Sequence, residues 1–280
     1  MQFSRSQWRL IESAPDHGAW NMAVDEAILE SAASGQNLPT LRIYRWQPAC
    51  LSLGYAQPLA DVDQGELSQR GWELVRRPTG GRAILHTDEL TYSVTGPQDE
   101  PRLAGSVLDS YRVLAQALLR ALQLLGLPAE AHAHNASAGN PSPGSESQNP
   151  VCFEVPSHYE ITVNGKKLIG SAQARRREGV LQHGSLPLYG DLSRITHALV
   201  FPGQAERQTA DERLRHRATT VEQILGASPP WDAVVEAFRT AFEETLDLDL
   251  LPGELTADEI ARAGQLVEEK YANPAWTERL

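Results

Sequence analysis

Short stretches of alternating apolar and polar residues, and short apolar runs, occur in the first hundred residues and again after residue 160. A two-residue period, or a brief apolar run bounded by glycine or proline, is typical of a β-strand. The run at residues 49–54, for example, is mostly apolar and ends at glycine. We therefore expect strands at residues 40–46, 49–54, 72–77, 82–86, 90–94 and 180–188.

Apolar residues at helical spacing mark a second set of segments. Residues 20–31 carry one apolar face, and a longer apolar face follows Ser106. Serine is a frequent helix N-cap, and Gly126 and Pro128 are placed to end the helix that Ser106 begins. The sequence thus predicts two amphipathic helices in its first half.

The C-terminal third is also predicted to be helical. Residues 191–201 and 228–246 have helical spacing, and the second segment has prolines at its first positions. A last helix is expected where Thr256 and Glu259 stand at capping-box spacing. We expect one catalytic domain over residues 1–250, with a C-terminal helical extension over 251–280 packed on it.

The clearest turn signal is Asn164-Gly165, which separates the apolar stretches 161–163 and 166–172. Asn-Gly favours the type I′ turn of a two-residue hairpin. Strands and helices do not alternate strictly, which predicts an α+β fold with a mixed, largely antiparallel sheet flanked by helices.

Residues 135–150 have a different composition. Twelve of these sixteen residues are Gly, Ser, Pro or Asn, so the segment has little apolar surface to bury. We expect a mobile loop over about residues 132–150, and loops of this length inside a domain often serve as lids or binding loops. It ends just before Cys152.

Composition and charge narrow the classes of function. The net charge of −11 argues against broad nucleic-acid binding, which needs a basic surface. Neither a secretion signal nor an apolar stretch long enough to span a membrane is evident, so we expect a cytoplasmic protein without membrane contact. Two arginine clusters could still steer an acidic partner: Arg76, Arg77 and Arg82, and Arg175, Arg176 and Arg177. For the second cluster, an ordinary solvated loop is the favoured interpretation.

The two cysteines, Cys50 and Cys152, have contrasting surroundings. Cys50 lies in an apolar strand and is expected to be a core residue. Cys152 follows the polar loop and has basic residues within reach, conditions that favour the reactive thiolate. A buried structural cysteine is the alternative at this position too.

The segment 76–94 holds a second candidate site. A strand ends in arginines, and Thr79-Gly80-Gly81-Arg82 then turns the chain into a strand that ends at His86. Paired glycines let the backbone approach a ligand and direct N–H groups toward an anion or carbonyl oxygen. A plain hairpin turn and a core histidine explain the same residues equally well. The pair His132 and His134 lacks a third metal ligand, so solvated loop residues are expected there and no metal site.

Lys166 and Lys167 follow the Asn-Gly turn and should point to opposite faces of their strand. One ammonium group must then face the covered side, where it needs a partner such as a thiolate or an acyl oxygen. The small residues of Gly170-Ser171-Ala172 would let a ligand lie against the strand. A pair of ordinary surface lysines is the alternative.

Four blocks in a fixed order resemble the lipoate/octanoate attachment family, also called the biotin/lipoate A/B protein ligase family. They are WRLIES with WNMAVDEAIL, RRPTGGRAILH, KKLIGSAQ with LQHGSL, and KYANPAWT. The resemblance implies the fold of class II biotin and lipoate ligases with an acyl tunnel. It implies that Lys167 holds the acyl carbonyl. It also implies substrate contacts from Arg76, Thr79, Gly80, Gly81, Arg82, His86, Gly170, Ala172 and His183.

Within this family, Cys152 in CFEVPS and Arg82 in place of a third glycine are similar to the cysteine-dependent octanoyltransferases of the LipM type. That similarity implies an octanoyl-acyl carrier protein as donor and a Cys152 thioester intermediate, with Lys167 catalytic and no cofactor. It implies a lysine of a lipoyl domain or glycine cleavage H protein as acceptor, in lipoate biosynthesis.

Other functions stay open on the sequence alone. They are an ATP-dependent ligase that forms an acyl-adenylate, an amidotransferase between acceptor proteins, and a non-catalytic acyl-binding scaffold. The preferred acceptor, the choice between octanoyl and lipoyl groups, and the oligomeric state are not determined by these patterns.

Overall fold

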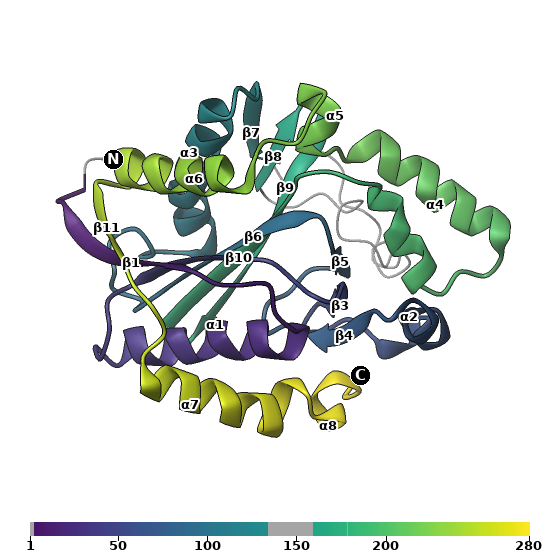
Figure 1. Cartoon of the computed structure of the whole chain (residues 1–280), viewed down its shortest axis with the longest axis horizontal. Helices are drawn as coiled ribbons and strands as arrows, with labels where there is room; N and C mark the ends of the chain where they lie inside the picture. Colours follow the sequence, from purple (N-terminus) through teal and green to yellow (C-terminus); the bar gives the residue numbers. More distant parts are fainter. Residues whose placement is uncertain (1–2, 134–158, 178) are drawn as a thin grey trace.

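The main element of the structure is an eight-stranded mixed sheet, seen edge-on through the middle of Figure 1. The structure is a computed structural model that describes residues 3–133, 159–177 and 179–280. Strand β1 pairs in parallel with β11 and β2, and every other pairing in this sheet is antiparallel. In spatial order the strands are β11 (Leu248–Pro252), β1 (Ser6–Glu12), β2 (Thr40–Tyr44), β6 (Glu89–Gly96), β10 (Gly179–Pro187), β9 (Lys166–Arg176), β8 (Tyr159–Val163) and β7 (Ala129–Ala133).

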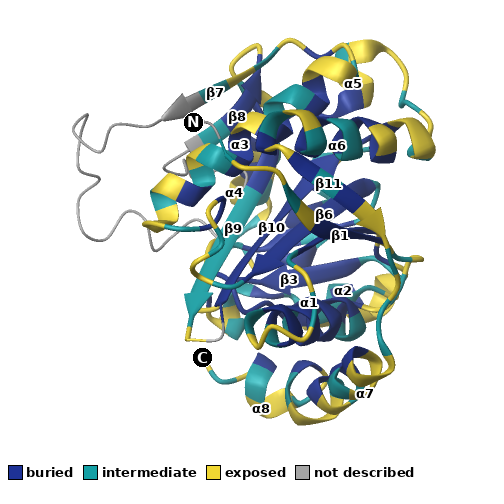
Figure 2. Ribbon diagram, turned by 90° about the vertical axis from the view of Figure 1, so that its left-hand side faces the viewer, coloured by how far each residue is buried: buried dark blue, intermediate teal, exposed yellow. Residues whose placement is uncertain are grey.

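The two faces of the sheet differ in polarity, although both are buried at its centre (Figure 2). Along β6, alternate residues point to opposite faces. Leu90, Tyr92 and Val94 belong to the largest apolar core, whereas the alternate positions are polar and include Thr91 and Ser93. One face therefore supplies most of the hydrophobic stability, and the other carries hydroxyl and charged groups into the interior.

Helices α3 (Val107–Leu124) and α6 (Trp231–Leu246) cover the apolar face (Figure 1). Helix α1 (Gly18–Ala33) covers the polar face, and α7 (Ala257–Leu266) packs on the outside of α1. Shorter helical segments complete this part of the chain: α5 (Val221–Leu225), the π-helical turn η5 (Val267–Tyr271) and α8 (Pro274–Thr277).

A second, three-stranded sheet lies on the polar side of the large one. Its order is β4 (Glu73–Arg76), β3 (Cys50–Leu53) and β5 (Ile84–His86). A separate apolar cluster joins it to η4 (Leu192–Ala198), α2 (Gln64–Arg70) and α4 (Gln204–Arg217), with η1 (Leu59–Asp61) nearby. The two sheets enclose the candidate site between them.

Several sequence predictions are confirmed. The fold is a mixed, largely antiparallel sheet flanked by helices. Asn164 and Gly165 have φ angles of 51° and 75°, as a type I′ turn requires. Ser106 caps α3 and Thr256 caps α7, each in a capping box with the residue three positions later.

Other predictions need correction. Residues 192–198 form a 3₁₀ helix rather than an α-helix. Pro230 is the N-cap of α6, so the prolines precede that helix instead of occupying its first positions. The helices α2 and α4 and the strands β1, β7 and β11 were not among the predicted elements.

The predicted loop over residues 132–150 lies mostly outside the described residues, although residues 132 and 133 end β7. The proposed boundary at residue 250 falls inside β11, which pairs with β1 at the edge of the large sheet. Within the described ranges, no helix combines the length and hydrophobicity needed to cross a membrane.

Candidate active site

A pocket of about 420 Å³, measured out to its open mouth, lies between the two sheets. Its wall is formed by side chains and backbone of helix α1 and of strands from both sheets, which are β2, β3, β5, β6, β9 and β10. Apolar and aromatic groups make up part of that wall, among them Met22, Tyr44, Trp46 and Ile84. A concave, largely preformed pocket of this kind is typical of a small-molecule site.

The imidazole of His86 forms one side of the pocket and is held in place by three neighbours. The ring of Trp46 stacks on it with the centroids 3.9 Å apart and the planes 8° from parallel. His86 Nδ1 lies 2.7 Å from Glu89 Oε1, and its Nε2 lies 2.8 Å from the hydroxyl of Ser52. Because all of these groups are buried, the hydrogen bonds of His86 with Ser52 and Glu89 fix the orientation of its imidazole ring.

A second row of buried, hydrogen-bonded side chains is centred on His183 of β10. His183 Nε2 lies 2.6 Å from the hydroxyl of Thr79, and its Nδ1 lies 3.6 Å from Asp25 Oδ2. Asp25 also bonds Arg42 Nη1 at 2.8 Å and the hydroxyl of Tyr44 at 2.9 Å. These contacts tie the loop that contains Thr79 to the buried side of α1.

The protonation states in this second row follow from burial and charge. Burial alone would raise the pKa of Asp25, but the hydrogen bond from His183 and the charge of Arg42 hold this pKa below its usual value. Burial lowers the pKa of His183, and the neighbouring carboxylate offsets only part of that effect. At neutral pH, Asp25 is therefore ionised and His183 is neutral, so the Thr79 hydroxyl donates to His183 Nε2.

The loop from Thr79 to Arg82 is fastened by the buried guanidinium of Arg77. Arg77 Nη2 donates to the carbonyl oxygens of Gly80 at 2.8 Å and Arg82 at 2.7 Å. Its Nη1 donates to the carbonyl of Ser52 at 2.8 Å. Gly81 has a φ angle of 91°, which only glycine adopts without strain. The loop is thus held rigidly at the edge of the pocket.

Close packing against this loop makes Gly54→Ala an informative substitution. A Cβ atom on Gly54 would lie 1.9 Å from the carbonyl oxygen of Gly81, so the loop would have to move. We expect a loss of about 1–3 kcal/mol in the free energy of unfolding, as for other overpacked sites, together with a lower rate of whatever reaction the pocket supports. Gly264→Ala is the control because a Cβ atom there meets nothing within 4 Å. Equal melting temperatures and rates for the two variants would show that the loop tolerates displacement.

Arg76 lies away from the pocket. It is fully buried and donates to backbone carbonyls of Gly54, Gln57 and Thr277. The prediction that Arg76 and Arg77 belong to a surface cluster that steers a partner is therefore wrong, because both guanidinium groups are used inside the protein. Arg82 is only partly exposed and does not line the pocket.

The prediction that Arg175, Arg176 and Arg177 form a solvated loop also needs correction. Arg175 and Arg176 form the end of β9, and only Arg177 of the three is fully exposed. Arg176 lies 3.8 Å from Glu26 on α1 and donates to the carbonyl of Pro78. Arg175 also donates to the carbonyl of Leu103 and to the hydroxyl of Ser110, so two members of the triplet have contacts within the protein.

Lys167 is buried, with 5% of its surface exposed, whereas Lys166 on the other face of the strand is partly exposed. The Lys167 ammonium lies 3.2 Å from Glu160 Oε1 on β8. The register between β8 and β9 is irregular next to this pair, a feature that re-aims side chains. The predicted division of the two lysines between a covered and an open face is confirmed.

Three residues after Lys167, strand β9 enters the wall of the pocket at Gly170, Ser171 and Ala172. At a rise of ~3.3 Å per residue, Lys167 and Gly170 are separated by about 10 Å along the strand. On the neighbouring strand, a Cβ atom on Gly184 would lie 2.6 Å from Ser171 Oγ. Glycine at this position keeps the wall of the pocket open.

The structure brings together some of the predicted site residues and separates others. Gly81, His86, Gly170, Ala172 and His183 line the pocket, and Thr79 bonds His183. Gly80 is exposed at the loop, and Lys167 lies further along β9. Cys152 and His134 lie outside the described residues. The pocket or supporting residues that sequence reasoning missed include Met22, Asp25, Tyr44, Trp46 and Ser52.

The sequence did contain signals for two of the groups at this site, Asp25 and the His86–Glu89 pair. Asp25 stands among apolar residues in α1 and is completely buried, and an acid in such a setting demands a partner. His86 and Glu89, three residues apart, also form a pair that local spacing could have suggested. No comparable signal marks Trp46 or Ser52, because tertiary packing alone brings them to the pocket.

Comparison with known proteins agrees with this geometry. The family model for the lipoyl protein ligase A/B catalytic domain matches residues 17–243. A protein named Octanoyltransferase LipM from Brevibacillus brevis is 40% identical over 278 residues, which cover 98% of this chain and 99% of that protein. Its namesake from Kyrpidia tusciae is 41% identical over 273 residues, with 97% and 98% covered.

Among solved structures, a bi-partite lipoate protein ligase from Thermoplasma acidophilum superimposes with a TM-score of 0.79 and 26% identity, covering 99% of this chain and 97% of that one. Lipoate-protein ligase A bound with ATP gives a TM-score of 0.78, also at 26% identity, with 97% and 98% covered. The resemblance seen in the four sequence blocks is confirmed, and the chain belongs to the lipoyl protein ligase A/B catalytic domain family.

Proposed function

We propose that this protein is an octanoyltransferase that moves an octanoyl group from an acyl carrier protein to a lysine of a lipoyl domain or glycine cleavage H protein, in lipoate biosynthesis. The observation that carries the proposal is the near full-length similarity, at 40–41% identity, to two proteins named Octanoyltransferase LipM. The fold alone would not distinguish this activity from ATP-dependent ligation, since both occur on it.

The pocket between the sheets suits an acyl chain. Met22, Trp46 and Ile84 offer apolar surface, and Gly170 and Gly184 leave room along two strands. Burial of each methylene group contributes about 0.8 kcal/mol, so an eight-carbon chain gains substantial binding energy there. Strand β9 leads from this wall to Lys167, which would place the acyl carbonyl near the lysine end.

The first chemical step is attack by the thiolate of Cys152 on the carbonyl carbon of the donor thioester. A tetrahedral oxyanion forms, the bond to the carrier sulfur then breaks, and the carrier leaves as a thiol after taking up a proton. The buried ammonium of Lys167 would stabilise the oxyanion, together with backbone N–H groups near Gly80 and Gly81. The product is an octanoyl thioester on Cys152.

The second step forms the product amide. The neutral amine of the acceptor lysine attacks the thioester carbon, the Cys152 sulfur leaves as a thiolate, and the amine loses one proton to solvent or to that thiolate. The same oxyanion stabilisation serves both steps. The amide is more stable than the thioester, which makes transfer to the acceptor favourable without nucleotide hydrolysis.

An ATP-dependent ligase is the second candidate, favoured by the similarity in structure to lipoate-protein ligase A bound with ATP. We expect octanoyl-acyl carrier protein and apo H protein to give octanoylated H protein without ATP, as measured by intact mass. Transfer from free octanoate that requires ATP would replace the transferase with the ligase. Transfer only from an already octanoylated acceptor would indicate an amidotransferase, and tight acyl binding without transfer would indicate a scaffold.

A further inference from the structure

We propose that the hollow between β5 and η4 binds the pantetheine arm on which the donor presents its octanoyl thioester. We call this hollow the arm site and define it by Leu85, Thr87, Tyr189, Arg194 and Leu214. The inference deepens the proposed function and rests on it, because it assigns a place to the donor of that reaction.

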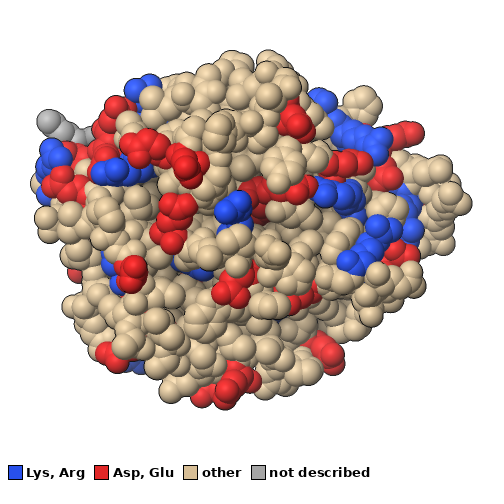
Figure 3. All heavy atoms as spheres, viewed as in Figure 1, with Lys and Arg blue, Asp and Glu red and all other residues tan. Residues whose placement is uncertain are grey.

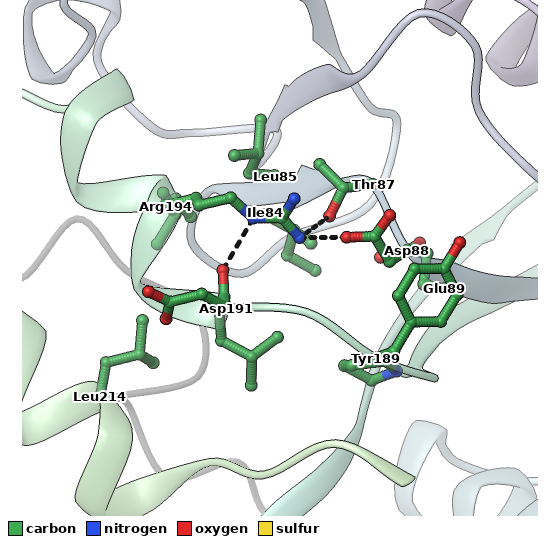
Figure 4. Close-up of a pocket in the computed structure, with 12 residues that line it drawn as sticks. Ile84, Leu85, Thr87, Asp88, Glu89, Tyr189, Asp191, Arg194 and Leu214 are labelled. Atoms are coloured by element: carbon green, nitrogen blue, oxygen red, sulfur yellow. Dashed lines mark hydrogen bonds and ion pairs between the residues drawn. The ribbon is translucent and has the colours of Figure 1, made fainter. Parts of the chain in front are cut away.

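The arm site is a hollow of about 450 Å³ next to the acyl pocket (Figure 4). Ile84 of β5 lines both cavities, so the two share a wall. On the far side of the hollow, the Leu214 carbonyl accepts the amide of Ala218 at 2.9 Å, and Ala218 forms a backbone bridge with Lys167. Four residues of helix rise about 6 Å, so the hollow begins close to the strand of Lys167. A thioester whose carbonyl is held by Lys167 therefore has the hollow within reach of its thiol side.

The wall that β5 supplies fits a chain of amide groups. Strand β5 is the end strand of the three-stranded sheet, and within the described ranges no strand pairs with its outer edge. An edge strand presents N–H and C=O groups that can bond an extended chain laid beside it. The hollow also has apolar side chains, which are Leu85, Leu192, Ile195 and Leu214. An extended ligand in which amides alternate with short alkyl segments, as they do in pantetheine, matches both features.

The charged groups around the hollow are paired within the protein, which favours an uncharged ligand. The Arg194 guanidinium reaches Thr87 and Asp88, as Figure 4 shows. Asp191 lies 3.1 Å from Arg215. Basic and acidic side chains are also interspersed on the side of the molecule where α4 lies (Figure 3). A ligand that binds through amides and hydroxyls leaves these pairs intact, whereas an anion would have to displace an acid from its arginine.

A nucleotide and the lysine of the acceptor are the other groups that the candidate reactions would bring here. Among the described residues that line the hollow, Arg194 has the one basic side chain, and it is paired with Asp88. Binding of a triphosphate needs several cationic groups or a metal ion. The lysine side chain of an acceptor has no amide in its four-carbon stem, so it would leave the edge of β5 unmatched. The donor arm is the occupant that uses both the edge strand and the apolar side chains.

The test compares octanoyl-pantetheine with octanoyl-N-acetylcysteamine, two donors with the same thioester and arms of different length. We expect kcat/KM for transfer to apo H protein to be about tenfold or more higher with octanoyl-pantetheine, because only its arm extends into the hollow. Leu85→Trp fills the hollow and should bring this ratio close to one. Leu124→Trp is the control, since Leu124 is 40% exposed on α3 and lines neither cavity. It should keep the wild-type ratio.

A second variant keeps the test decisive if Leu85→Trp fails to fold, as a melting temperature would show. Tyr189 is 46% exposed at the edge of the hollow, so Tyr189→Ala should fold and should also lower the ratio. The proposal would be overturned by a wild-type ratio near one, by an unchanged ratio in both hollow variants, or by an equal fall in Leu124→Trp. Binding of ATP that Leu85→Trp abolishes would likewise overturn it, because the hollow would then be a nucleotide site.

A binding measurement separates this inference from the proposed function. Pantetheine methylated at its sulfur has no acyl group to transfer, and an NMR titration should give a higher Kd for it with Leu85→Trp than with the wild-type enzyme. If that difference is found but neither donor gives octanoylated H protein, the proposed function is wrong and the arm site stands. If both donors transfer octanoyl groups equally well, the proposed function stands and the arm site is wrong.

Discussion

Replacing Cys152 by serine is expected to lower octanoyl transfer by about 10³-fold or more, because the proposed covalent step needs a thiolate. A serine hydroxyl stays protonated at neutral pH and becomes a nucleophile only beside a base placed to receive its proton. The measurement is the intact mass of the enzyme after mixing with octanoyl-acyl carrier protein alone, together with the transfer rate. Wild-type enzyme should gain one octanoyl group and the variant none.

Cys50 supplies the matched control. Its thiol is fully buried, and burial together with the nearby charges of Glu73 and Glu89 raises its pKa well above the usual value. Cys50→Ala should therefore lower the melting temperature, as the loss of a buried side chain does, and still permit the gain of one octanoyl group. If Cys152→Ser were octanoylated at the wild-type rate, Cys152 could not be the nucleophile.

Local signals in the sequence were sufficient for the elements that carry strong turn or cap chemistry. The Asn164-Gly165 turn and the capping boxes that begin with Ser106 and Thr256 depend on residues close together in the chain. Strand β1, seven residues long, was not recognised, and helix α4 was missed because it has little apolar periodicity. Only Ala210 and Leu214 of α4 are buried, so the helix depends on its contacts with the rest of the fold.

Apart from His183, which the family resemblance supplied, the site was predicted where its residues follow one another in the chain. The Thr79–Arg82 loop and the Gly170–Ala172 stretch are each recognisable as a short sequence. The two rows of hydrogen-bonded side chains at the pocket cannot be recognised in this way. His183 and Thr79 are 104 positions apart in the sequence, and Ser52 and His86 are 34 apart. The same limit explains Arg76 and Arg77, whose charge suggested a surface role although carbonyl oxygens from distant segments surround them.

The pocket and the proposed covalent transfer depend on residues from different parts of the sequence. The pocket lies between the two sheets, with Trp46 and His86 fixed by stacking and hydrogen bonds. The proposed choice of covalent transfer over adenylation depends instead on Cys152 and on Arg82 in the place of a third glycine.

Lys167→Met is expected to lower the transfer rate by about 10²–10³-fold, the range found when one oxyanion donor is removed from an enzyme. The buried ammonium is the charge that would meet the developing oxyanion, and methionine keeps the volume of the side chain without its charge. Steady-state kcat measures the effect, and the single-turnover rate of acyl-enzyme formation assigns it to the first step. Lys166→Met, one position earlier on the opposite face, should remain near the wild-type rate.

The ion pair with Glu160 requires one further variant, because Lys167→Met alone would leave a mostly buried carboxylate without its partner at 3.2 Å. In Lys167→Met/Glu160→Gln both charges are absent, so the fold should recover most of any stability that the single variant loses. The transfer rate should stay low in the double variant if the ammonium acts on the acyl oxyanion. Recovery of the rate together with the melting temperature would show that Lys167 only neutralises Glu160 and has no part in the reaction.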